Sequence, residues 1–211
     1  MNTARLVIAT HNRKKLVELH AILAAAGVDL PDGELVTSGD IGAPEPVEDG
    51  ITFEENALIK ARAVCRSTGL PAVADDSGLA VDVLGGAPGI FSARWSGRHG
   101  DDQANLDLLL AQLADVRPEH RSAAFVCAAA LVTPDGTEEV RRGEMRGTLT
   151  AAPRGTHGFG YDPILVPQDQ PASSSPLTSA ELDPAVKNSI SHRGKAFRSL
   201  APVILGRLAV R

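Results

Sequence analysis

Acidic side chains gather at two places along the sequence. They are Glu45, Glu48 and Asp49, which precede a helix start signal, and Asp75 and Asp76, which follow an apolar run. Mg²⁺ prefers oxygen ligands and usually binds through one or two carboxylates while it bridges substrate phosphates. A pair of aspartates can also cap a turn, but a carboxylate at the end of a buried strand is costly without a partner. The pattern predicts a metal-binding site, with turn capping as the alternative.

A polar turn follows the first apolar run of the chain. Its residues are Thr10, His11, Asn12, Arg13, Lys14 and Lys15. At a strand-to-helix turn, free backbone N–H groups and the positive end of the helix dipole favour an anion, and Lys15 can add a point charge. The turn therefore predicts a phosphate site. Ordinary capping by Thr10 or Asn12, with solvated lysines, is the alternative.

The segment 155–163 is rich in glycine and contains aromatic residues. Its central part is Phe159, Gly160, Tyr161 and Asp162. Glycines let a backbone approach a flat ligand closely while an aromatic ring stacks on it. A glycine-rich turn whose aromatic side chains cover the core is the alternative.

A basic cluster stands where the last helix is predicted to begin. It comprises Lys187 and the string Ser191-His192-Arg193-Gly194-Lys195. Cations at a helix start oppose the helix dipole, so the cluster predicts an anionic or carbonyl-bearing partner; a solvated basic face is the alternative. Together the four segments offer a phosphate cradle, a metal-binding acid, a stacking aromatic and a donor cluster. That combination predicts a nucleoside triphosphate site.

Hydrophobic periodicity places these segments at the ends of predicted strands and helices. The predicted strands cover residues 5–10, 71–74 and 123–132, the last turning at 134–136 into another strand; the predicted helices cover 14–27, 52–69, 102–115 and the stretch from Ser191. Thr52 and Glu55 have the spacing of a capping box, and Pro202 should kink or end the first part of the last helix. Segment 168–176, rich in Pro and Ser, is predicted to be a mobile loop. We expect one α/β domain with helices against a twisted sheet.

Composition narrows the class of protein. The 211 residues are 43% hydrophobic, which suits one compact domain or two closely packed lobes. The net charge of -5 argues against non-specific binding to nucleic acid polymers. No apolar run approaches the roughly 18 residues of a membrane span, and with Cys65 and Cys127 both in apolar runs we expect a reduced, cytoplasmic protein.

Five strings, in this order and spacing, resemble the inosine triphosphate pyrophosphatase family, the XTP/dITP diphosphohydrolases, over nearly the whole chain. They are Val7-Ile8-Ala9-Thr10-His11-Asn12-Arg13-Lys14-Lys15, Thr52-Phe53-Glu54-Glu55-Asn56-Ala57, Ala74-Asp75-Asp76-Ser77-Gly78-Leu79-Ala80-Val81, Gly158-Phe159-Gly160-Tyr161-Asp162-Pro163 and Ser191-His192-Arg193-Gly194-Lys195. The resemblance implies Mg²⁺-dependent cleavage of dITP, ITP and XTP to the monophosphate and pyrophosphate. It also implies a long twisted mixed sheet with flanking helices, arranged as two lobes around a central cleft, and a homodimer.

The resemblance also assigns roles to residues. Asp76 would be the catalytic acid/base and a Mg²⁺ ligand with Glu48, for which Glu45 and Asp75 are rivals. The substrate would be bound by Thr10, His11, Asn12, Arg13, Lys14, Lys15, Ser77, Phe159, Gly160, Tyr161, Asp162, Lys187, His192 and Arg193. Two departures from the family pattern are His11, where a small residue is common, and a longer segment 168–176.

Overall fold

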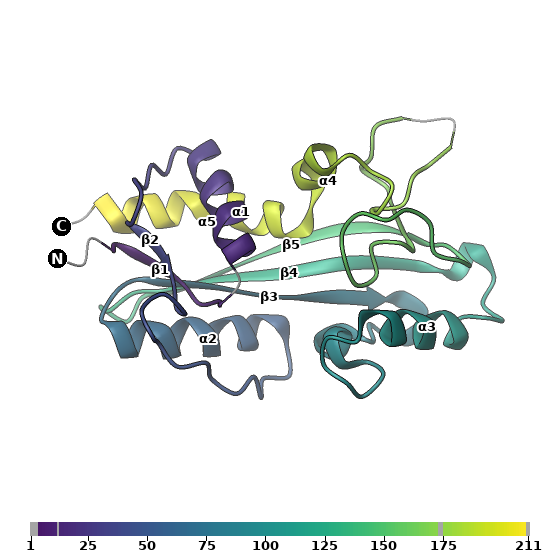
Figure 1. Ribbon diagram of the computed structural model, residues 1–211, viewed down its shortest axis with the longest axis horizontal. Helices are drawn as coiled ribbons and strands as arrows, with labels where there is room; N and C mark the ends of the chain where they lie inside the picture. Colours follow the sequence, from purple (N-terminus) through teal and green to yellow (C-terminus); the bar gives the residue numbers. More distant parts are fainter. Residues whose placement is uncertain (1–3, 12, 173–174, 210–211) are drawn as a thin grey trace. The chain divides into compact units, whose positions relative to one another are not determined.

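The computed structural model describes residues 4–11, 13–172 and 175–209, with only the backbone of Lys14 (Figure 1). Its α-helices are α1 Arg13–Ala25, α2 Phe53–Thr68, α3 Asp102–Gln112, α4 Pro184–Ile190 and α5 His192–Ala209. Its strands are β1 Leu6–Ile8, β2 Leu35–Thr37, β3 Ala72–Val81, β4 Ser122–Val132, β5 Glu138–Leu149 and β6 Leu165–Pro167. Short 3₁₀ helices lie at Asp82–Leu84, Gly89–Arg94 and Pro118–His120.

The strands form one mixed sheet in the order β2-β1-β3-β4-β5-β6. Strand β1 pairs in parallel with both β2 and β3, whereas β5 and β6 pair antiparallel. The predicted α/β fold is therefore confirmed, as is the mixed sheet that the family resemblance implies. The predicted turn between the two long strands is present as well, because the Thr133 N–H donates to the Thr137 carbonyl at 3.0 Å.

The chain divides into two compact units. The first comprises Met1–Asp76, Cys127–Gly143 and Arg193–Arg211, and the second comprises Ser77–Val126 and Glu144–His192. Strands β3, β4 and β5 contribute residues to both units, so the division does not follow the order of the sequence. The arrangement of the two lobes around a cleft stays a prediction.

In the first unit, α1 and α5 cover one face of the sheet and α2 covers the other (Figure 1). The apolar side chains that α1 and α5 bury form one cluster with the strands. This cluster comprises Leu6, Ile8, Leu19, Leu23, Val28, Leu30, Leu35, Val73, Cys127, Ala129, Leu131, Ala196, Phe197, Leu200, Ala201 and Ile204. Burial on this scale is the main source of stability, and it fixes the strand that carries Asp75 and Asp76.

The second unit has a core of its own, which α3 completes with the leucines predicted to stripe it. This core comprises Leu79, Val81, Leu106, Leu109, Leu113, Ala123, Phe125, Met145, Leu149, Tyr161, Ile164 and Leu165. Tyr161, which belongs to the glycine-rich segment 155–163, is part of this core. Its packing holds that segment against the sheet.

Helix α2 begins and ends where the sequence predicts. The Glu55 N–H donates to the Thr52 hydroxyl at 3.1 Å, and the Glu55 carboxylate accepts the Ile51 N–H at 2.7 Å. Gly69 ends the helix in the left-handed region, with φ of 67°, which only glycine adopts at no cost. The capping box thus fixes the register of the α2 face that meets β3.

The predicted end of strand 71–74 is wrong. Strand β3 continues through Asp75, Asp76 and Ser77 to Val81, and the alternative in which the two aspartates cap a turn is wrong with it. The strand continues because both carboxylates have partners across the fold, which removes the cost of burying them.

Three short elements, β2, β6 and α4, are not predicted from the sequence, and α5 does not end at Pro202. Three-residue strands and a seven-residue helix carry too little periodicity to be recognised. Whether Pro202 kinks α5 stays a prediction, as does mobility of segment 168–176. No helix among the described residues is long and apolar enough to span a membrane.

Candidate active site

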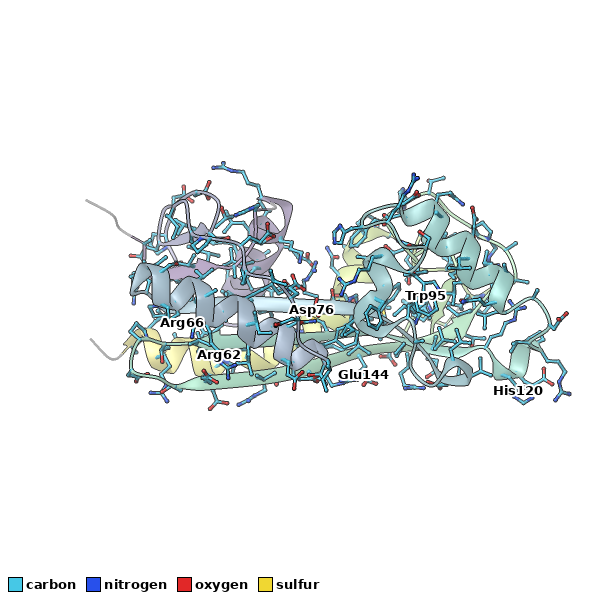
Figure 2. All side chains as sticks on the ribbon, turned by 90° about the horizontal axis from the view of Figure 1, so that it is seen from below. Arg62, Arg66, Asp76, Trp95, His120 and Glu144 are labelled. Carbon is cyan, nitrogen blue, oxygen red and sulfur yellow. The ribbon has the colours of Figure 1, made fainter. Side chains whose placement is uncertain are left out.

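Asp75 and Asp76 are adjacent on β3 and point to opposite faces of the sheet, as neighbours on a strand must. Asp75 faces α1 and α5, where Lys15 and Arg193 contact it. Asp76, labelled in Figure 2, faces α2, where Asn56 and Lys60 contact it. The two aspartates therefore belong to two different sites, both within the first unit.

Asp76 lies at the centre of a small polar cluster. Its Oδ2 accepts a hydrogen bond from the Asn56 amide at 3.2 Å, and its Oδ1 lies 3.5 Å from Lys60 Nζ. The same Lys60 ammonium lies 3.1 Å from Glu48 Oε1. Asp76 and Glu48, the predicted pair of carboxylates, are thus brought together around one cation.

Burial raises the pKa of Asp76, and this effect outweighs the opposing attraction of Lys60. Burial alone would lower the pKa of Lys60, but the charges of Asp76 and Glu48 raise it, so the ammonium stays charged. A carboxylate whose pKa is raised toward neutral pH is better suited to take a proton from water. The Asp76 cluster therefore has the electrostatics of a general base.

Asp75 forms a buried ionic network. Arg193 donates to Asp75 Oδ2 through Nη2 at 2.8 Å and Nε at 3.2 Å, and to Glu18 through Nη1 at 3.0 Å. Lys15 Nζ lies 3.3 Å from Asp75 Oδ1. The Asp75 side chain is 3% exposed and that of Arg193 is 12% exposed. The anionic partner predicted for the basic cluster is thus, for Arg193, a pair of carboxylates in the protein.

This network makes the folded state sensitive to acid. Burial would raise the pKa of Asp75, but Arg193, Lys15 and Lys60 outweigh it and hold that pKa far below its usual value. A lowered pKa contributes stability above the unfolded-state value of about 3.9, which is lost as pH falls below it. We expect the unfolding free energy in EDTA to fall as pH drops below about 4. Urea titrations of the wild type and of Asp75→Asn would show this, and equal pH slopes below that value would contradict the network.

The predicted phosphate turn lies between β1 and α1. His11 Nδ1 lies 3.6 Å from Glu45, Arg13 donates to Asp40 at 2.6 Å, and Lys15 faces Asp75. A Cβ added to Gly39 would come within 2.9 Å of the His11 ring, so a glycine at that position makes room for the imidazole. The Thr10 carbonyl accepts from Ser38 at 3.1 Å. Asn12 and the side chain of Lys14 lie outside the described residues.

In the second unit, the glycine-rich segment and α4 meet at Asp162. Its Oδ2 accepts from Lys187 Nζ at 2.6 Å and from the Phe159 N–H at 2.9 Å. Lys187 Nζ also lies 5.9 Å from the centre of the Phe159 ring, while that ring is 72% exposed. Gly158, at φ of 82°, has no room for a side chain, because a Cβ would collide with the Asp162 carboxylate. The segment presents one exposed aromatic ring beside one cation.

The two aromatic residues of the segment have different environments. Tyr161 is 4% exposed, and its hydroxyl donates to the Ser92 carbonyl at 2.9 Å, so its side chain anchors the segment to the core. The Gly160 N–H donates to Asp102 at 3.0 Å. Phe159 is therefore the ring that could stack on a ligand, whereas Tyr161 covers the core.

The predicted substrate residue Ser77 follows Asp76 within β3.

His192 begins α5 and belongs to the second unit. Its ring stacks on Phe125, with the ring centres 5.2 Å apart and an interplanar angle of 20°. This contact fixes the plane of the imidazole, which would let its ring nitrogens serve as directed donors or acceptors.

Sequence reasoning missed Asn56 and Lys60 as site residues, although both stand in or near the α2 string. Asn56 is 1% exposed and lies on the helix face that otherwise buries apolar residues, among them Phe53, Ala57 and Ala61. Lys60 follows one turn later on the same face. A polar residue interrupting an apolar stripe was the signal that could have found them.

The Asp76 cluster contains the two carboxylates predicted to hold Mg²⁺, Asp76 and Glu48, and each of them contacts the Lys60 ammonium. No group of three or more His, Cys, Asp or Glu side chains that could hold a metal ion is present among the described residues. Mg²⁺ usually takes one or two carboxylates and completes its shell with water and substrate phosphates. Asp76 and Glu48 could act in this way if the metal replaced their contacts with Lys60, whereas Asp75 lies on the opposite face with Arg193 and Lys15. The magnesium site stays a prediction.

Comparison with known proteins shows to which family the chain belongs. The sequence profile of the Ham1 family matches residues 6–203. The chain belongs to the Ham1 family. It is 61% identical over 200 residues to a protein of Streptomyces coelicolor named dITP/XTP pyrophosphatase, covering 95% of this chain and 96% of that protein. It is 62% identical over 202 residues to a protein of the same name from Streptomyces avermitilis, with the same coverage.

Solved structures agree with this assignment. A HAM1 protein from Coxiella burnetii matches with a TM-score of 0.85 at 38% identity, covering 96% of this chain and 99% of that one. A structure from Mycobacterium abscessus described as nucleoside-triphosphatase and dITP/XTP pyrophosphatase matches with a TM-score of 0.77 at 52% identity, covering 95% and 99%. The mixed sheet with flanking helices is thus the fold of Ham1 proteins.

Proposed function

We propose that this Ham1-family chain hydrolyses the non-standard purine nucleotides dITP, ITP and XTP to the monophosphate and pyrophosphate, which removes them from the nucleotide pool. What carries the proposal is the identity of 61% and 62%, over nearly the full length, to two proteins named dITP/XTP pyrophosphatase. The Asp76 cluster supports it, because it combines a carboxylate of raised pKa with a charged lysine and a second carboxylate.

Asp76 is proposed to accept the proton of the water that attacks the α-phosphorus. The new bond joins the water oxygen to the α-phosphorus. The bond that breaks joins the α-phosphorus to the oxygen that it shares with the β-phosphorus, and pyrophosphate leaves with that oxygen. Lys60 stays protonated between Asp76 and Glu48 and so keeps positive charge at the site as negative charge grows on the phosphates. Lys15 and Lys187 are proposed to offset the same charge.

The proposed metal is Mg²⁺, held by Asp76 and Glu48. When bound, it would supply Lewis-acid stabilisation of the phosphate oxygens. The role of the protein is to hold the two carboxylates at one place, which Lys60 and Asn56 do through the contacts described above.

Base selection is proposed to rest on Phe159 and on donors from His192 and Arg193 to the 6-oxo group. Adenine carries an amino group there, and a buried donor left without a partner costs about 1–3 kcal/mol. Arg193 gives Nε, Nη1 and Nη2 to Asp75 and Glu18, so two of its five N–H groups remain for the substrate. We propose that its larger contribution is to hold Asp75.

Phe159→Ala should raise the KM for dITP by about tenfold or more, because loss of a base-stacking ring costs about 1–3 kcal/mol. Phe91→Ala is a matched control. Phe91 is also exposed, at 50%, and has Arg94 5.3 Å from its ring centre. Steady-state kinetics of both variants on dITP would show the difference. An unchanged KM for Phe159→Ala would remove the ring from the base site.

Product analysis tests the proposed reaction. ³¹P NMR of dITP turned over with Mg²⁺ should show deoxyinosine monophosphate and pyrophosphate in equal amounts. Release of orthophosphate with the diphosphate would place the cleavage at the γ-phosphorus and contradict the proposal.

The resemblance further supports a homodimer in the cytoplasm. Light scattering across a range of protein concentrations would test the dimer, and a mass of 22.0 kDa at every concentration would contradict it.

A further inference from the structure

Asn56 is a fully buried polar residue in the first turns of α2, with both ends of its side chain in use. Its Oδ1 accepts the Gly50 N–H at 2.9 Å, and its Nδ2 donates to Asp76 Oδ2 at 3.2 Å. Only 1% of the residue is exposed. One amide therefore connects the segment that carries Glu48 to the carboxylate on β3.

The chemistry of its neighbours fixes the orientation of this amide. A backbone N–H can only donate, so the atom that faces Gly50 must be the amide oxygen. The amino group is then left facing Asp76, and it is a donor whether the carboxylate is ionised or not. The opposite orientation would put the amide oxygen against the carboxylate oxygen and the amino group against the Gly50 N–H, breaking both bonds.

The contacts of Asp76 divide between its two oxygens. Asn56 occupies Oδ2, while Oδ1 is on the side of Lys60. Each oxygen of the Asp76 carboxylate therefore faces one donor from α2, and Asn56 supplies the uncharged one. A side chain at position 50 would collide with this arrangement, because a Cβ added to Gly50 would come within 2.7 Å of Asn56 Oδ1 and 2.8 Å of the Glu55 Cβ.

We propose that Asn56 is a positioning residue for hydrolysis: its amide fixes the rotation of the Asp76 carboxylate and holds the Glu48 segment beside it. This inference rests on the proposed function. A base that is held in one orientation reacts in a larger share of encounters, and a shift of about 1 Å at such a group can cost about a hundredfold in rate. Asn56 contacts only protein groups, so its loss should affect the reaction more than substrate binding.

Asn56→Asp is the sharpest test, because it has the same shape and keeps an acceptor for the Gly50 N–H while it removes the donor to Asp76. We expect kcat for dITP to fall by about tenfold to a hundredfold. The KM, and the affinity for dITP measured by calorimetry in EDTA, should change by less than about threefold.

Asn105→Asp is the matched control. Asn105 is also 1% exposed, and its Oδ1 accepts the Ser96 N–H at 2.7 Å, but it lies on α3 and this contact is within the second unit. It should cost similar stability and leave kcat within about twofold, since a mutation outside the reacting groups removes no transition-state contact.

Gly50→Ala tests the same connection from the other side and decides the matter if Asn56→Asp does not fold. Its methyl group would displace the amide from the loop, so kcat should fall with KM unchanged. Kinetics of Asn56→Asp equal to those of Asn105→Asp, or a loss of nucleotide affinity as large as the loss of kcat, would overturn the inference. If the wild type itself releases no pyrophosphate, the proposed function fails instead.

Discussion

Asp76→Asn should lower kcat for dITP by about 10²- to 10⁴-fold, the range expected when a general base is removed. The variant should fold as well as the wild type, because burial raises the pKa of Asp76 and a neutral amide avoids the cost of burying its charge. Lys60 keeps Glu48 as a partner at 3.1 Å. Pyrophosphate release and the urea midpoint of the purified variant would be measured side by side.

Asp49→Asn is the control for this prediction. Asp49 is an exposed member of the acidic segment that also carries Glu48, so the same change in charge and shape is made beside the site without touching Asp76. Near wild-type kcat in Asp49→Asn is expected. Near wild-type kcat in Asp76→Asn would show that the reaction does not use the α2 face of β3.

Asp75→Ala should destabilise the fold by about 3–5 kcal/mol, because it leaves the buried guanidinium of Arg193 without its main partner. Both side chains of this pair are nearly buried, at 3% and 12% exposed. Denaturant titration at neutral pH would measure the loss. A loss of less than about 1 kcal/mol in the free energy of unfolding would mean that the Asp75–Arg193 pair contributes no more than an ordinary surface ion pair.

The surface pair Arg62–Glu138 provides the comparison. It has shorter contacts, 2.6 and 2.7 Å, but its side chains are 39% and 36% exposed, so Glu138→Ala should cost about 0.2–1 kcal/mol. Replacing both buried partners, as Asp75→Leu with Arg193→Met, should regain most of the lost stability, because no lone charge of the pair remains buried.

The sequence predicted those elements whose signals are local. Thr52 and Glu55 indicate the start of α2, and Gly69 indicates its end. The apolar runs of β1 and β4 indicate buried strands. Each of these signals depends on residues within a few positions of one another, and the structure has each element where its signal stands.

The end of β3 could not be predicted in the same way, because the partners that let it continue are distant in sequence. Asp75 is 118 positions from Arg193 and 60 from Lys15. Without them, two adjacent aspartates resemble a turn. The same reason explains why Arg193 was expected to meet a substrate and is found to hold Asp75 and Glu18.

The candidate site was predicted in part. The residue types at Asp76, Glu48, Phe159 and Lys187 indicated their chemistry, and the structure brings Asp76 to Glu48 and Phe159 to Lys187. Asn56 and Lys60 were missed because their polar partners, on β3 and in the segment before α2, become neighbours of the helix only in the folded chain.

The most direct test of the central claim is pyrophosphate release from dITP, XTP, dGTP and dATP at equal concentration, each with Mg²⁺ and with EDTA. The proposed function predicts strong release from dITP and XTP, little from dGTP and dATP, and none with EDTA. Equal release from all four nucleotides would contradict selection for non-standard purines, and no release from any would contradict the enzyme itself.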